Sequence, residues 1–157
     1  MTKFAFAFAL AVLAFSACGP DYLVKESREI DASGWAYKDT IDFAFEITDT
    51  TQLYDLEIAV AHDADFPYQN MYTLISTRFP SGQRLQKQLS LELADKAGVW
   101  AGDCSRKSCT LKIPIQQGAY FNEAGAYLIT LEQFMRVDPL PGIKRITLQI
   151  RPVGKRQ

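Results

Sequence analysis

Cys18 is the residue whose chemistry its neighbours define most directly. It follows a twelve-residue apolar run, Phe4 to Phe15, and the small residues Ser16 and Ala17. A run of twelve is too short to cross a hydrocarbon core, which needs about 20 residues, and it suits the apolar part of a signal peptide. Small residues directly before a cysteine are typical of bacterial lipoprotein precursors. We therefore expect residues 1–17 to be removed and Cys18 to carry a lipid anchor.

Cys104 and Cys109 are the other two cysteines, within the sequence GDCSRKSC. Export to an oxidising compartment favours a Cys104–Cys109 disulfide, with free thiols as an alternative. A zinc site is a weaker alternative, because the chain has a single histidine, His62, and zinc needs four ligands. A bridge closing so short a loop is expected to contribute only about 2 kcal/mol, by pinning a hairpin tip.

His62 and Asp63 are of the residue types that a catalytic triad uses. Their adjacency in sequence does not orient a general base, so we expect His62 to be a solvated loop residue. Asp63, Asp65 and Asn70 offer oxygen ligands of the kind that calcium binds, but without a recognised loop spacing. The expectation for this stretch is a polar turn.

Glu123 and Glu132 could be imagined as the two carboxylates of a glycosidase, but the sequence gives no distance between them. No glycine-rich loop links a strand to a helix, as nucleotide binding would require. We predict no catalytic residues, no metal site and no cofactor, and therefore no enzymatic activity.

Aromatic residues raise the question of ligand stacking. Aromatic side chains in a small β domain are more often core than contact residues. Arg136, next to Met135, is expected to be a structural ion-pair partner near a turn. The set that could stack on sugar rings is Trp35, Tyr37, Trp100 and Tyr120. The candidate interaction surface is Trp35, Tyr37, Tyr68 and Arg136.

Alternating apolar and polar residues predict most of the secondary structure. The stretch 84–93 has helix propensity too, but its leucines alternate strictly, which favours a strand. The connection FMRVDPLPG is expected to contain one helical turn. The expected strands lie at about 41–47, 56–60, 71–79, 85–93, 111–115, 127–131 and 146–150, the fifth of these ending by Pro114 and Gly118. About seven to eight short strands with little helix predict a single-domain antiparallel β-sandwich, of the jelly-roll or immunoglobulin-like type.

The predicted organisation is a signal peptide at 1–17, a lipidated N-terminus and tether at 18–38 with room for one edge strand, a β-sandwich at 39–152 and a basic tail at 153–157. The chain has 17 basic and 18 acidic residues, and losing Lys3 with the leader would move its net charge from −1 to −2. This balance predicts no nucleic-acid binding.

Several stretches resemble the GldH family of gliding-motility lipoproteins from Bacteroidetes-type bacteria. They are FPYQNMY, LADKAGVWAG and, most specifically, GAYLITLEQFMRVDPLPGI, and the likeness runs from about Cys18 to Ile150. The cysteine pair stands where that family tends to have a glycine-rich turn, and His62 stands where we expect an arginine.

The resemblance implies a lipoprotein of the cell envelope, anchored in the outer membrane through Cys18. It implies a role in surface motility and in the associated secretion of adhesins, through protein partners in a motility or secretion complex and without catalysis. The alternative is a glycan-binding β-sandwich that uses Trp35, Tyr37 or Trp100. An exposed row of aromatic side chains would favour this alternative.

Overall fold

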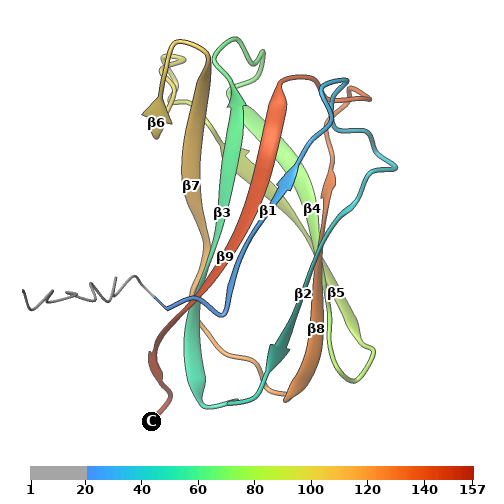
Figure 1. Cartoon of the computed structure of the whole chain (residues 1–157), viewed down its shortest axis with the longest axis vertical. Coiled ribbons are helices and arrows are strands. Elements are labelled where there is room, and N and C mark those ends of the chain that lie inside the picture. Colours follow the sequence, from blue (N-terminus) through green and yellow to red (C-terminus); the bar gives the residue numbers. More distant parts are fainter. Residues whose placement is uncertain (1–20) are drawn as a thin grey trace, which may run out of the picture.

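The computed structural model describes residues 21–157, which form two antiparallel β-sheets packed face to face (Figure 1). Cys18 and the predicted signal peptide lie outside the described residues. One sheet has the strand order β1-β9-β3-β7-β6 and the other β2-β8-β4-β5. The strands are β1 (Val24–Glu29), β2 (Ile41–Ile47), β3 (Gln52–Asp63), β4 (Asn70–Arg78), β5 (Arg84–Glu92), β6 (Asp103–Cys104), β7 (Ser108–Ala119), β8 (Gly125–Gln133) and β9 (Ile143–Lys155).

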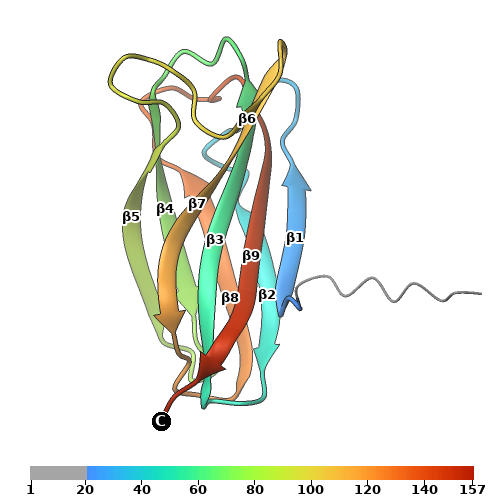
Figure 2. The same ribbon diagram turned by 90° about the vertical axis from the view of Figure 1, so that its left-hand side faces the viewer.

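The strand pairing is nested, which distinguishes between the two predicted types of sandwich. β4 pairs with β5, β3 with β7, β2 with β8 and β1 with β9, all antiparallel. A chain paired in this way is one long hairpin that has been rolled into two sheets, with two Greek keys, and this is the jelly roll. Figure 2 views the sandwich through the five-stranded sheet, where β7, β3, β9 and β1 lie side by side.

Alternation of apolar side chains builds the core, as the sequence predicted. In β2, Ile41, Phe43 and Ile47 are all buried, while Asp42 and Glu46 between them are exposed. β9 contributes Ile146, Leu148 and Ile150 from the opposite sheet. Because successive side chains of a strand point to opposite faces, each sheet presents one apolar face to the other.

Three details of the secondary structure differ from the prediction or extend beyond it. β7 does not end at Pro114 but runs through it to Ala119. β6 pairs only with Thr110 and Cys109, so the rest of β7 is an edge of its sheet. Proline, which has no N–H to donate, is tolerated at a sheet edge. The expected helical turn at 134–142 is absent. β9 extends into the predicted basic tail, whereas β1 is the edge strand for which the tether had room.

Residues 21–157 contain no helix that is long and apolar enough to cross a membrane.

Candidate functional site

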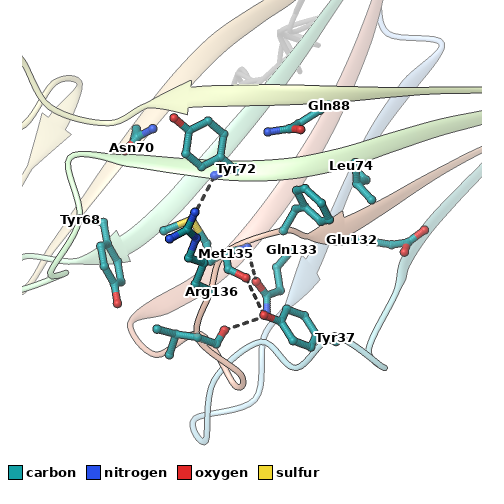
Figure 3. Close-up of a pocket in the computed structure, with 12 residues that line it drawn as sticks. Tyr37, Tyr68, Asn70, Tyr72, Leu74, Gln88, Glu132, Gln133, Met135 and Arg136 are labelled. Carbon is teal, nitrogen blue, oxygen red and sulfur yellow. Dashed lines mark hydrogen bonds between the residues drawn. The ribbon is translucent and has the colours of Figure 1, made fainter.

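The outer face of the four-stranded sheet carries a groove of about 900 Å³ at the end where β3, β8 and β1 finish (Figure 3). We call it the aromatic groove, and its principal residues are Tyr37, Tyr68, Tyr72, Phe134, Arg136 and Val137. They come from four separate segments: the β1–β2, β3–β4 and β8–β9 connections and strand β4.

Exposed apolar side chains are concentrated in this groove. The exposed fractions are 47% for Tyr37, 40% for Tyr72, 50% for Phe134 and 37% for Val137. Burying such side chains is favourable by about 25 cal/mol per Å² of apolar surface. A cluster of exposed apolar side chains is therefore a typical feature of surfaces that bind a partner.

Gln133, the last residue of β8, shapes one wall of the groove. Its buried side chain accepts a hydrogen bond from Met135 N–H at 2.9 Å and donates one to Val137 O at 3.1 Å. These two bonds hold the backbone on either side of Arg136. The backbone N–H of Phe134 also donates to Tyr72 O at 2.8 Å. The segment predicted as a helical turn is therefore an irregular loop held by several hydrogen bonds. Residues before Pro139 and Pro141 are also biased away from helix.

Tyr37 lies beside Gln133 in Figure 3 and is fixed to the same loop at two points. Its hydroxyl donates to Met135 O at 2.6 Å, and its backbone N–H donates to Asp138 Oδ1 at 2.8 Å. Behind it, Trp35 and Leu140 exchange two backbone hydrogen bonds of 2.8 and 2.9 Å. Gly34, at φ +109°, allows this approach, because a Cβ there would lie 2.7 Å from Leu140 O. The walls of the groove are thus held in place without a ligand.

Charge at the groove comes from Arg136 and Glu132. Glu132 Oε1 lies 3.8 Å from the guanidinium of Arg84, so it already has a cationic neighbour. Arg136 is exposed, and in residues 21–157 no carboxylate lies within 4.0 Å of its guanidinium. The expectation that Arg136 is a structural ion-pair partner is therefore wrong for the described part of the chain.

Three of the four residues proposed from the sequence as an interaction surface, Tyr37, Tyr68 and Arg136, line this one groove. Trp35 does not belong with them. It is only 1% exposed, and its indole N–H donates to Asp39 O at 2.6 Å, so it is a core residue that supports the loop carrying Tyr37. Sequence reasoning did not place Tyr72, Phe134 or Val137 in this surface. The available signal was two apolar side chains in a segment that interrupts the strand alternation just before the prolines.

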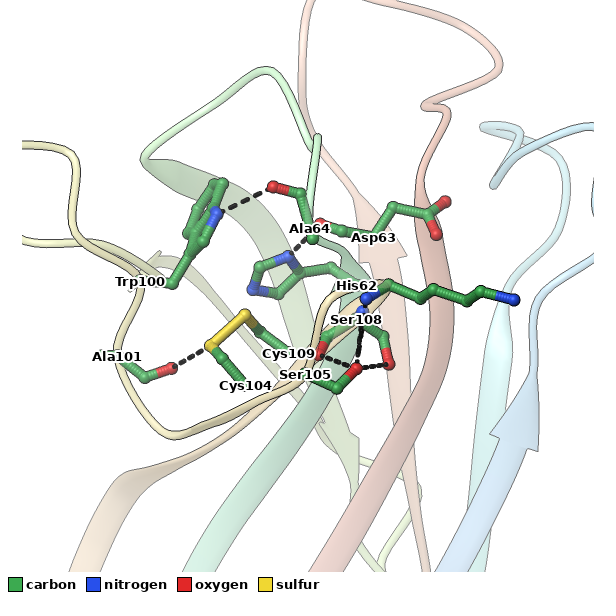
Figure 4. Close-up of a disulfide and its surroundings, with 10 residues drawn as sticks. His62, Asp63, Ala64, Trp100, Ala101, Cys104, Ser105, Ser108 and Cys109 are labelled. Carbon is green, nitrogen blue, oxygen red and sulfur yellow. Dashed lines mark hydrogen bonds between the residues drawn. A yellow bond between two sulfur atoms is a disulfide. The ribbon is translucent and has the colours of Figure 1, made fainter.

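His62 is not the solvated loop residue expected from the sequence. It is the penultimate residue of β3, has no exposed surface, and lies 4.6 Å from the Trp100 ring and 5.6 Å from the Phe66 ring, centroid to centroid (Figure 4). Its Nδ1 donates to Asp63 O at 2.8 Å, and its Nε2 has no hydrogen-bond partner among the described residues. The aromatic loops that fold over the end of β3 exclude water from a residue that the local sequence alone placed in solvent.

Cys104 and Cys109 form a disulfide, shown in Figure 4 beside Trp100 and His62. The two residues are directly opposite partners in the β6–β7 hairpin. Trp100 donates from its indole N–H to Ala64 O at 2.9 Å, which ties the same loop to the end of β3. The bridge therefore closes a hairpin tip, as the spacing predicted.

The candidate carboxylate pair is not assembled. Glu123 precedes β8 and bonds Ser81, while Glu132 lies near the end of β8. With a rise of about 3.3 Å per residue, the strand separates them by more than about 20 Å, whereas a glycosidase pair needs about 5–9.5 Å. Within residues 21–157, no three His, Cys, Asp or Glu side chains are grouped as metal ligands, and this covers Asp63 and Asp65.

The candidate stacking set is also dispersed. Trp35 is buried, Trp100 is half-buried against His62, and Tyr120 packs against Arg156 at 4.8 Å. Only Tyr37 lies in the aromatic groove.

The fold and its groove define a class, a jelly-roll domain with an ordered groove that exposes several apolar side chains. The family model described as GldH lipoprotein matches residues 22–150, and the chain belongs to this family. The Gliding motility lipoprotein GldH homolog of Christiangramia forsetii is 25% identical over 146 residues, covering 90% of this chain and 89% of that protein. Gliding motility lipoprotein GldH of Flavobacterium johnsoniae is 22% identical over 137 residues, covering 87% of this chain and 84% of that protein.

Proposed function

We propose that this protein is a lipid-anchored component of the cell envelope that supports gliding motility and the associated adhesin secretion machinery by binding another protein in the aromatic groove. The names of the two relatives and the family description support the motility and lipoprotein parts of this proposal. The observation that carries the binding part is the gathering of Tyr37, Tyr72, Phe134 and Val137 in one preformed groove.

The position of the groove suits an anchored protein. Anchoring through a lipid on Cys18 would place the membrane near the start of β1, and an outer-membrane location is part of the proposal. Figure 1 shows the chain entering at residue 21 beside the start of β1, whereas the connections that build the groove lie at the far end of the sandwich. The groove is also on the sheet that does not contain β1. In this proposal the groove would face away from the anchor and be open to a partner.

Contact, rather than covalent chemistry, is the mode of action that we propose. Within the described chain, Cys104 and Cys109 are bonded to each other, and His62 is buried at the opposite sheet from the groove. The side chains that do face the groove are mainly aromatic and aliphatic, and tyrosine and arginine are the residue types most enriched at protein interfaces.

The test is complementation of a strain that lacks the chromosomal copy, scored by colony spreading with protein abundance measured in parallel. Phe134→Ser removes the most exposed aromatic side chain of the groove. Leu85→Ser is the matched control, because Leu85 is 64% exposed and lies on β5 outside the groove. We expect Phe134→Ser to lose motility at normal abundance and Leu85→Ser to retain it.

Retention of full motility by Phe134→Ser and by a second groove variant, Tyr72→Ser, would contradict the proposal. Loss of motility in a variant of a buried or distant polar residue, His62→Ala or Glu123→Ala, with the protein abundant and folded, would instead indicate an active site elsewhere.

A further inference from the structure

Three of the polar side chains that line the aromatic groove are engaged within the protein. The Nδ2 of Asn70 donates to Ser90 Oγ at 3.1 Å, Gln133 bonds its own loop, and the carboxylate of Glu132 faces Arg84 at 3.8 Å. A neutral sugar needs several free, directed donors and acceptors around an aromatic platform. Among the described residues, the hydroxyls of Tyr68 and Tyr72 and the amide of Gln88 make no side-chain hydrogen bond, so glycan binding is kept as an outcome that the test below must exclude.

Arg136 is the charged group that the groove leaves free. Its exposed guanidinium has no carboxylate within 4.0 Å in residues 21–157, and it stands between Met135 and Val137 in the ordered wall. A guanidinium forms two parallel hydrogen bonds with a carboxylate, and charge-assisted bonds of this kind are about twice as strong as neutral ones. The charge complement of this groove is therefore an acidic side chain or a C-terminal carboxylate.

Apolar surface lies on both sides of that cation. Tyr68 and Tyr72 line the groove together with Arg136, and the backbone N–H of Tyr72 donates to the sulfur of Met135, the neighbour of Arg136, at 3.2 Å (Figure 3). Phe134 and Val137, both largely exposed, precede and follow Arg136 along the wall. A segment that satisfies all of these groups carries a carboxylate flanked by aromatic or aliphatic side chains.

The walls are ordered before any partner binds. Tyr37 is held by Met135 and Asp138, and Gln133 bonds the backbone of Met135 and Val137, on both sides of Arg136. A preformed site loses little conformational entropy on binding, so a short extended segment can be recognised without remodelling.

We infer that the aromatic groove binds an extended, acidic and apolar segment of a partner protein, with a carboxylate of that segment paired to Arg136 and its apolar side chains packed on Tyr72, Phe134 and Val137. This inference rests on the proposed function and specifies the chemistry of the partner at the same site.

The test is selection of random dodecapeptides displayed on phage, using the full chain extracted in detergent and immobilised through a C-terminal tag. We expect the selected peptides to be enriched in Asp or Glu beside aromatic or aliphatic residues. Arg136→Gln should still select apolar peptides but lose the acidic enrichment. Arg78→Gln is the matched control, because Arg78 is an exposed arginine on β4 outside the groove lining, and it should select the same peptides as the natural chain.

The strongest selected peptide then gives a quantitative comparison. Changing its acidic residue to the amide should weaken binding by about tenfold, as expected for a charge-assisted contact at an interface. The same change should have no effect on binding to Arg136→Gln.

Recovery of no peptides, or of peptides without acidic enrichment, would overturn the inference. So would binding of a β-1,4-linked glucose tetrasaccharide that competes with the peptides. If Phe134→Ser abolishes motility in cells while the selection shows no acidic preference, the groove remains the contact site and only the acidic partner is rejected.

Discussion

At the scale of single residues, Tyr127 shows how the core and its few polar groups depend on each other. It is 2% exposed, stacks on Phe45 at 5.6 Å and meets Phe121 edge-on at 4.8 Å. Its hydroxyl donates to Glu123 O at 2.9 Å. Burial raises the pKa of Tyr127 above its ordinary value; the bond to the Glu123 carbonyl opposes this, and the Glu123 charge reinforces it.

We predict that Tyr127→Phe lowers the free energy of unfolding by about 1 kcal/mol at neutral pH, by deleting one hydrogen bond. Tyr127→Ala should cost about 3–5 kcal/mol, because it also leaves a cavity. The pKa of Tyr127 is higher in the folded protein than in the unfolded chain. The neutral phenol therefore stabilises the fold fully at pH values below its unfolded pKa. This stabilisation is lost as the pH rises through the folded pKa.

The measurement is urea denaturation of both variants at neutral pH, followed by a pH series into the alkaline range. The loss of stability at high pH should be smaller in Tyr127→Phe than in the natural chain. An identical alkaline loss in both proteins would show that Tyr127 does not contribute to it.

At the scale of elements, the loop between β5 and β7 is held by the disulfide and by the hydrogen bond from Trp100 to Ala64 O. β6 is only two residues long and pairs with β7 through Asp103–Thr110 and Cys104–Cys109. Gly102, at φ +84°, brings this strand against β7 so closely that a Cβ there would clash with the backbone of Thr110. The bridge therefore joins two strands that already meet, and it constrains little additional chain.

We predict that replacing Cys104 and Cys109 together by serine leaves the sandwich folded and lowers the free energy of unfolding by only about 2 kcal/mol. Hydrogen exchange should increase in residues 101–109 and remain unchanged in β2, β8 and β9, because these strands do not depend on the bridge. Global unfolding, or faster exchange throughout the four-stranded sheet, would assign the disulfide a larger role than the geometry gives it.

The strands were largely predictable because alternation records which face of each strand is buried, a local property of the sequence. The leucines of 85–93 were enough to identify β5 as a strand despite its helix propensity.

The groove was only partly predictable. Tyr37, Tyr68 and Arg136 were singled out, but their meeting depends on the nested pairing of distant strands and on the side chain of Gln133. The burial of His62 and Trp35 likewise comes from loops that fold over them, which no local pattern records.

At the scale of the whole molecule, the start of the described chain and the aromatic groove lie apart. In Figure 1, residue 21 lies beside the start of β1 in the lower half of the sandwich, and the connections that build the groove lie at the top. Because a lipid anchor would restrict the protein to a membrane surface, a groove turned away from the anchor remains available to partners within the envelope.

We predict that Cys18→Ser releases the protein from the membrane fraction and prevents processing at residue 17, since one uncleaved apolar run of twelve residues cannot replace a diacylglyceryl anchor. Fractionation of cells with immunodetection measures the first effect, and intact mass measures the second. Unchanged membrane association together with unchanged processing would contradict the lipoprotein assignment of Cys18.

The most direct test of the central claim is to block the aromatic groove in living cells after the protein has folded. Gln88→Cys places a thiol at the groove, and Lys112→Cys places one at an exposed position of β7 on the other sheet. The measurement is the gliding speed of single cells before and after addition of a bulky maleimide, with the extent of labelling determined for both variants. We predict that cells with Gln88→Cys stop on labelling while cells with Lys112→Cys keep moving. Equal motility of the two strains at equal labelling would contradict a role for the groove in contact.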